Sequence, residues 1–161
     1  MPGAPKRNAG LTVGILSDTH GLLRLEAAEA LQGSDHIIHL GDVGDAAILE
    51  ALSSLAPLTA IRGNIDVMGP CAQLPAARFL TLGCHKLYLL HNLAELTVDP
   101  AASGLVAVLY GHTHRPLIEN RNGVLFFNPG SCGPRRFALP VTLGRLRVTE
   151  KVVSAEIVEL R

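Results

Sequence analysis

Short apolar runs alternate with polar segments along the first half of the chain. Apolar runs over 11–17 and 36–40 predict strands, and each is followed by a segment with helical spacing, over 22–32 and 45–55. Gly33 is the expected stop of the first helix and Asp45 the expected N-cap of the second. The expected inner face of the first helix consists of Leu22, Leu25, Ala28 and Leu31.

The second half of the chain is rich in strands. We expect them over 57–62, 77–82, 86–90, 105–110, 117–121 and 124–128, with two more inside 139–160. Gly83 and the pair Asn122 and Gly123 mark hairpin turns. Alternating strands and helices followed by a strand-rich second half predict an α/β fold, in which helices flank two packed sheets. We expect a flexible tail over 1–10 and a single domain over 11–161.

Composition narrows the classes of partner. The 161 residues carry no net charge and have a pI of about 7.1, so no basic surface indicates binding of a nucleic-acid polymer. Cys71, Cys84 and Cys132 are odd in number and lack CxxC spacing, which favours reduced thiols and a cytoplasmic location. No apolar segment is long enough for a signal or a membrane span, so we expect no membrane partner.

Side chains that can bind metal follow the predicted strands. They are Asp18 and His20 in SDTHG, Asp42 in LGD, Asn64 in RGN, His91 in LLHN, and His112 and His114 in GHTH. Ligands in open sheets gather beyond the carboxyl ends of strands, and two adjacent divalent cations need about this many donors. In an extended chain, residues i and i+2 point the same way, so each HxH or DxH pair is expected to straddle two cations.

Each of these motifs also has a purely structural interpretation. Asp42 taken alone favours a helix cap or turn, and His91 taken alone favours a packed histidine. GHTH is more specific, because two imidazoles around one threonine are costly to bury without a partner. The recurrence of all five segments in order, each behind an apolar run, favours a common site.

With SDTHG, HLGD, RGN, GHTH and NPGS in this order, the chain resembles the calcineurin-like metallophosphoesterases, specifically their small bacterial and archaeal phosphodiesterase branch. The similarity runs from about Leu11 to the carboxyl end. It implies a four-layer sandwich of two mixed β-sheets flanked by helices. It also implies two ligand sets that share Asp42 as a bridge: Asp18, His20, Asp42 and His114 for one ion, and Asp42, Asn64, His91 and His112 for the other.

The activity that this resemblance implies is hydrolysis of a small phosphodiester by attack of a metal-bound hydroxide in a binuclear site. A bound water's pKa falls from about 15.7 toward 7 on such cations. Asn64 is expected to act twice, with its carbonyl on metal and its NH₂ on a phosphate oxygen, so we assign it to metal binding, substrate binding and catalysis. The donor set suits Mn²⁺, Fe or Zn, with Ni also open, and the resemblance favours Mn²⁺.

Two residues depart from the pattern of the wider superfamily. Ile65 stands where many members carry a histidine assigned as general acid, and isoleucine cannot donate a proton. We therefore expect a preference for activated or diester leaving groups. Asn92 follows His91 where relatives usually have glycine, which makes His91 the least secure ligand.

Other polar residues are candidates for supporting roles. Arg62, Arg135 and Arg136 could match phosphate, although most arginines are simply solvated. Arg62 and Arg135 are equal candidates for phosphate contact, and we assign Arg62 to substrate binding. We expect the NPGS segment, 128–131, to form a tight loop beneath the metal floor. Asp66 and His39 are expected to support the ligands, whereas His36 and His85 are assigned to solvent or turns.

Two other functional classes stay open. A non-catalytic interaction scaffold on the same fold would resemble the retromer subunit, although every ligand position here carries a ligand-competent residue. An amidohydrolase or metallo-β-lactamase type of site is disfavoured, because the HxH comes late in this chain and continues with Arg115 and Pro116. The natural substrate and a homo-oligomeric state are not readable from the sequence.

Overall fold

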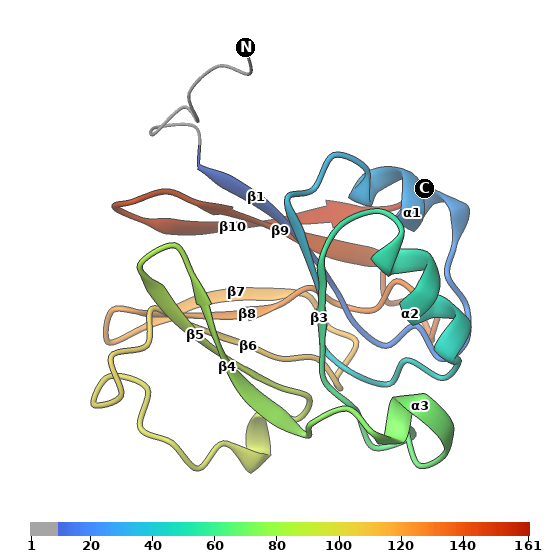
Figure 1. Ribbon diagram of the computed structural model, residues 1–161, viewed down its shortest axis with the longest axis horizontal. Coiled ribbons are helices and arrows are strands. Elements are labelled where there is room, and N and C mark those ends of the chain that lie inside the picture. The colour runs from blue at the N-terminus through green and yellow to red at the C-terminus, as the bar shows by residue number, and fades with distance from the viewer. Residues whose placement is uncertain (1–9) are drawn as a thin grey trace.

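In the computed structural model, which describes residues 10–161, two five-stranded β-sheets lie against each other (Figure 1). The tail predicted over 1–10 falls outside this range except for Gly10. The first sheet has the order β10-β9-β1-β2-β3. Its strands are β1 (Leu11–Leu16), β2 (His36–His39), β3 (Leu58–Ala60), β9 (Thr142–Val148) and β10 (Val153–Glu159). The pairs β1 with β2 and β2 with β3 are parallel, and the other two pairs are antiparallel.

The second sheet has the order β4-β5-β6-β8-β7. Its strands are β4 (Ala77–Leu82), β5 (His85–Leu90), β6 (Ala107–Leu109), β7 (Leu117–Arg121) and β8 (Val124–Asn128). The two hairpins predicted in this region are confirmed, with β4 antiparallel to β5 and β7 antiparallel to β8. Asn122 and Gly123 have φ values of 52° and 83°, which is the left-handed conformation of a type I′ turn.

The part of the chain that the structure describes also has short helices: α1 (Leu25–Leu31), α2 (Ala46–Ser53), α3 (Gly69–Ala72) and the 3₁₀ turn η1 (Leu93–Glu95). Asp45 caps α2 as predicted, since its side chain accepts a hydrogen bond from the Ala47 amide. The predicted face of α1 is correct at Leu31, which is buried, but wrong at Leu22 and Leu25, which are 39% and 70% exposed, and it missed the buried Ala27. The helix begins only after Arg24, which shifts the buried face.

Alternation along the strands sends side chains into different apolar layers. Ile15 and Ile38 point into the core between the sheets, where they join Leu109 and Phe127 of the second sheet. Their neighbours Leu16 and Ile37 belong to the layer under α1 and α2. On the outer face of the second sheet, the segment that carries η1 covers a third apolar cluster. The predicted class of two mixed sheets with helical cover is thus confirmed, although this outer layer has no long helix.

The parallel strands bring several chain segments to one edge of the molecule. The segments after β1, β2 and β3 in one sheet, and after β5, β6 and β8 in the other, lie at strand carboxyl ends. Hydrogen bonds join these segments. Gly111 N donates to His91 O within the second sheet, and His112 N donates to an Asp18 carboxylate oxygen between the two sheets. Among residues 10–161, no helix combines the length and the apolar character that crossing a bilayer requires.

Candidate metal centre

The backbone at the expected ligands is not extended. Asp18, His20, Asp42, His112 and His114 all have positive φ, between 46° and 72°. Such conformations cost about 1–3 kcal/mol each in residues other than glycine and cluster at functional sites. The expectation that the ligand pairs at positions i and i+2 lie in extended chain is therefore wrong.

Bonds between loops hold this strained backbone. Asp18 N donates to Gly41 O at 3.0 Å and His20 N donates to Asp42 O at 2.9 Å, so the loops after β1 and β2 are tied together. Two glycines, one in the loop after β3 and one in the loop after β6, let these loops approach the Asp42 and Asp18 carboxylates. A Cβ added at Gly63 would overlap the Asp42 carboxylate, and one added at Gly111 would overlap Ser17.

One cluster of side chains gathers around Asp18. Its Oδ1 lies 3.3 Å from His114 Nε2 and 3.6 Å from His20 Nε2, and the three residues can offer one ligand atom each to a common ion. The His20 and His114 rings have centroids 5.3 Å apart. Although burial disfavours ionisation of Asp18, the neighbouring His114 and His20 imidazoles outweigh burial and hold its pKa far below the ordinary value.

A second cluster contains Asp18, Asp42 and His91. His91 Nε2 lies 3.3 Å from Asp42 Oδ2 and 3.7 Å from Asp18 Oδ1, and His20 Nε2 reaches the same Asp42 oxygen at 3.5 Å. Asp42 Oδ2 therefore lies between the two imidazoles, as a bridging ligand would. Burial lowers the pKa of His91, but the Asp42 and Asp18 carboxylates outweigh it, so the net shift is upward. Burial likewise raises the pKa of Asp42, whereas His91 and the Ile65 amide lower it and prevail.

The two remaining expected ligands lie on the solvent side of the second cluster. His112 Nδ1 is 3.2 Å from Asn64 Oδ1, and the His112 ring meets the His91 ring edge-on at a centroid distance of 5.3 Å. Both Asn64 and His112 are exposed, in contrast to the buried His91. The structure thus brings all the expected ligands into one continuous group of side chains.

The donor atoms of this group fit divalent cations. Within residues 10–161, four buried side-chain atoms lack a hydrogen-bond partner: Asp18 Oδ1, His20 Nε2, His91 Nε2 and His114 Nδ1. His91 Nδ1 donates to Leu40 O at 2.7 Å, which leaves a lone pair on Nε2, the tautomer that metal-binding histidines use. A lone pair that faces two carboxylates at 3.3 Å and 3.7 Å needs a positive charge between them. Neither distance is that of a charge-assisted hydrogen bond, which is about 2.7–2.9 Å.

Asp66 supports the centre from beneath. Its buried carboxylate accepts hydrogen bonds from the amides of Val43, Gly44 and Gly63 at 2.9–3.1 Å. These amides flank Asp42 on one loop and Asn64 on the other. Asp66 therefore fixes the positions of two expected ligands, as predicted.

His39 has a comparable role under the first loop. Its Nδ1 accepts from Gly41 N at 3.1 Å, so Nε2 carries the proton and donates to Thr19 Oγ1 at 3.0 Å. Thr19 in turn donates to Val43 O at 2.8 Å. Burial lowers the pKa of His39 to about 4, which keeps the ring neutral and preserves this chain of bonds.

The NPGS loop braces two of the ligand loops. Asn128 donates to Gly111 O and Thr113 Oγ1 at 3.1 Å and 3.0 Å, and its own oxygen accepts from Gly130 N. Ser131 Oγ donates to Asp18 O at 3.0 Å. The loop is thus a support beneath the centre, as the sequence indicated.

Sequence reasoning gave no role to two buried hydroxyl side chains of SDTHG. Ser17 Oγ donates to Asp18 Oδ2 at 2.7 Å, which leaves Oδ1 as the oxygen turned toward the imidazoles. Thr19 carries the bond to His39 described above. Their place beside ligands inside a quoted motif was the available signal.

Other sequence assignments have mixed outcomes. His85 is buried in β5 with Nε2 2.7 Å from Thr149 O, so its assignment to solvent or a turn is wrong, and His36 lies in β2 beside Thr59. Asn92 has a φ of −113°, so this position does not need glycine, and its side chain caps η1.

The arginines differ in their distance from the centre. Arg62 lines a groove of about 200 Å³ together with Asn64, His91 and His112, and one of its N–H groups donates to Leu74 O. Arg135 and Arg136 are exposed on the loop after Gly133 and do not line this groove.

Comparison with known proteins gives consistent matches. Residues 11–151 match the model of the calcineurin-like phosphoesterase superfamily domain. The chain is 32% identical to the probable metallophosphoesterase MJ0623 of Methanocaldococcus jannaschii over 88% of this chain and 78% of that protein. It is 30% identical to the phosphodiesterase YfcE of Escherichia coli K12 over 81% and 84% of the two chains. Vacuolar Protein Sorting 29 from Cryptosporidium parvum shares the fold, with a TM-score of 0.76, 18% identity and coverage of 95% and 99%.

Proposed function

This chain belongs to the calcineurin-like phosphoesterase superfamily, and from that premise we propose that it is a phosphodiesterase that hydrolyses a small phosphodiester at a two-cation centre. One observation carries the proposal. Asp18 and Asp42 lie among imidazoles, and the buried atoms His20 Nε2, His91 Nε2, His114 Nδ1 and Asp18 Oδ1 lack hydrogen-bond partners among residues 10–161. Carboxylate and imidazole atoms without hydrogen-bond partners can bind cations. Cation binding would also explain why the strained, positive-φ backbone at these residues is kept.

The chain offers donors for both ions. Asp18, His20, Asp42 and His114 would hold one ion, and Asp42, Asn64, His91 and His112 would hold the other. Bound there, the cations would lower the pKa of a water toward 7 and neutralise charge on the phosphoryl oxygens. The absence of thiolate from the donor set supports a borderline metal, and we propose Mn²⁺, with Fe, Zn or Ni as alternatives.

The residues at the solvent side would bind the substrate. Asn64 can direct its NH₂ at a phosphate oxygen, and Arg62 lies in the same groove with guanidinium N–H groups that match phosphate. Ile65, beside Asn64, has no proton to give a departing alkoxide. We therefore propose that good leaving groups, such as those of aryl diesters, are hydrolysed fastest.

The test is hydrolysis of bis-p-nitrophenyl phosphate with Mn²⁺, compared with p-nitrophenyl phosphate. We expect the diester to be the better substrate, and Asp42→Ala to lose more than about 100-fold in kcat/KM while its circular dichroism spectrum stays native. Asp35→Ala is the matched control, because Asp35 is an exposed carboxylate whose bond to Thr12 N is remote from the centre. Full activity in Asp42→Ala would refute the bridging role.

A non-catalytic scaffold is the second candidate, because Vacuolar Protein Sorting 29 shares the fold. The same assay separates the two functions. Cations bound without turnover of either ester, with Mn²⁺, Fe²⁺ or Zn²⁺, would favour the scaffold.

We also propose a cytoplasmic location and a small substrate in place of a nucleic-acid polymer. The free thiols of Cys71, Cys84 and Cys132 suit a reducing compartment, and the zero net charge provides no general attraction to polyanions. Binding of DNA or RNA with an affinity that falls steeply as salt increases would contradict the proposal of a small substrate.

A further inference from the structure

Two grooves with different chemistry flank Asn64. The polar groove, of about 200 Å³, is lined by Arg62, Asn64, Asn92, Glu95 and His112 among others. The second groove, of about 150 Å³, is called the apolar groove because most of its lining is apolar. It is lined by Gly44, Ala46, Ile65, Val67, Met68, Pro70 and Cys71, together with the buried Asp66. Asn64 and Ile65 are adjacent, so the two grooves begin on either side of one peptide unit.

The apolar groove borders the metal centre. Ile65 N donates to Asp42 Oδ1 at 3.0 Å, which places one wall next to the proposed bridging carboxylate. On the opposite wall, Gly44 packs so closely against His20 that an added Cβ would overlap the His20 backbone. The groove therefore begins beside Asp42, because Ile65 bonds to the Asp42 carboxylate and Gly44 follows Asp42 by two residues.

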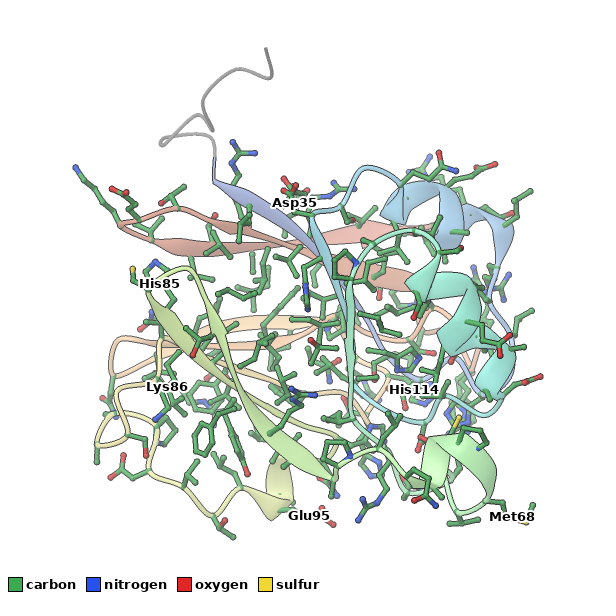
Figure 2. All side chains as sticks on the ribbon, in the orientation of Figure 1. Asp35, Met68, His85, Lys86, Glu95 and His114 are labelled. Carbon is green, nitrogen blue, oxygen red and sulfur yellow. The ribbon has the colours of Figure 1, made fainter. Side chains whose placement is uncertain are left out.

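The apolar side chains of this groove are open to solvent. Ile65, Val67 and Met68 are 40%, 73% and 82% exposed. Single exposed apolar residues are ordinary, but a cluster beside a reactive centre indicates a binding surface. In Figure 2, Met68 and Glu95 lie along the same side of the molecule, with His114 between them in this view.

The walls of this groove are held in place. Asp66 lies between Ile65 and Val67 in the chain, and its carboxylate accepts hydrogen bonds from the amides of Val43, Gly44 and Gly63. The groove is therefore present before the substrate binds, which lowers the entropic cost of binding.

We propose that the substrate is an asymmetric phosphodiester with one apolar arm and one hydroxyl-bearing arm. This inference rests on the proposed phosphodiesterase function, because the two arms of a diester diverge from a phosphorus atom held near Asn64. The apolar arm, an aryl ring or a chain of about five carbons, would occupy the apolar groove, since 150 Å³ holds about five groups the size of water. The other arm would lie beside the Arg62 guanidinium, which has further N–H groups besides those that would bind the phosphate, and the Glu95 carboxylate, an acceptor. A donor and an acceptor together suit vicinal hydroxyls.

The experiment compares two diesters with the same leaving group. Both carry p-nitrophenyl, for the apolar groove, and the second arm is either 2,3-dihydroxypropyl or pentyl. With Mn²⁺ present, we expect the dihydroxypropyl diester to have a KM about tenfold lower, because the pentyl arm would displace water from Arg62 and Glu95 without replacing its hydrogen bonds. The kcat values should be similar, because the chemistry at phosphorus is the same.

Variants assign each arm to its groove. The double variant Val67→Ser, Met68→Ser should raise KM about fivefold for both diesters with little change in kcat, since contact with the ring is lost equally in the ground and transition states. Glu95→Leu should instead remove most of the preference between the diesters. Val152→Ser is the matched control, because Val152 is 53% exposed but lines a different pocket, with His85 and Lys151.

The outcomes separate this inference from the function on which it rests. If the wild type hydrolyses neither diester, the phosphodiesterase function itself is wrong. If it hydrolyses both with equal KM, or if the double variant behaves like Val152→Ser, the function stands and the asymmetric substrate is refuted. Unchanged preference in Glu95→Leu would refute the placement of the hydroxyl-bearing arm.

Discussion

Replacement of Asp66 by asparagine should damage the fold and the metal centre together. The carboxylate accepts three hydrogen bonds, with Oδ2 bound to Val43 N and Gly63 N and Oδ1 bound to Gly44 N. An amide keeps one oxygen, so at best it loses the Gly44 bond and turns its NH₂ toward that N–H. A lost charge-assisted bond and an unsatisfied buried donor amount to about 2–4 kcal/mol.

For a chain of this length, that loss corresponds to a fall in Tm of about 4–16 °C. Calorimetry of the metal-free protein measures it, and a titration with Mn²⁺ should show affinity weakened by about 10–100-fold, because the same bonds position Asp42 and Asn64. Asp35→Asn is the control, since the Asp35 carboxylate is exposed and accepts one bond, from Thr12 N, at an expected cost under about 1 kcal/mol. A Tm for Asp66→Asn within 2 °C or so of the wild type would refute this reasoning.

Three further predictions concern the ions, the loop packing and the pH dependence. Mn²⁺ at about 100 times its Kd should stabilise the protein against thermal unfolding by about 2.7 kcal/mol for each ion bound, and EDTA should reverse the effect. Gly63→Ala should abolish metal-dependent hydrolysis, because its Cβ would overlap the Asp42 carboxylate. Gly83→Ala has open space, and although its φ of 61° strains an alanine, it lies away from the centre and should stay active. Because burial lowers the pKa of His39 to about 4, the unfolded chain takes up the proton first, so stability is fully present above about pH 6.5 and about 2.5 kcal/mol is lost by pH 4.5. Denaturant titrations at pH 7 and 4.5 should show this loss in the wild type and a much smaller one in His39→Gln.

The strands of the second sheet were predictable because their patterns are local. The predicted bounds of β4, β7 and β8 agree with the structure, since each strand is a segment of five or six residues that ends at a turn with a clear signal. Asp45 was likewise readable as a cap. By contrast, α3 is four residues long and has no amphipathic period to detect. The inner face of α1 was missed because loop contacts after β1, which the sequence does not display, decide where the helix begins.

The sequence was enough to predict which residues form the candidate site, but not their backbone conformation. Strand ends and donor types were enough to select Asp18, Asp42 and His91, which the fold brings within a few ångströms of one another. The left-handed backbone at the ligands could not be predicted, because positive φ at residues such as His112 or His114 depends on bonds to distant loops and is unfavourable for the residue alone. The apolar groove was equally hidden, since exposure of Val67 and Met68 beside the centre is a property of the folded chain.

The spacing of the two cations is the central claim, and electron paramagnetic resonance of the Mn²⁺-loaded protein tests it most directly. Metals about 3.5–4 Å apart and bridged by one carboxylate are magnetically coupled. We expect a coupled-pair spectrum at two Mn²⁺ per chain, replaced by the spectrum of isolated ions in Asp42→Ala. A wild-type spectrum of isolated Mn²⁺ alone, or no bound Mn²⁺ near neutral pH, would contradict the binuclear centre.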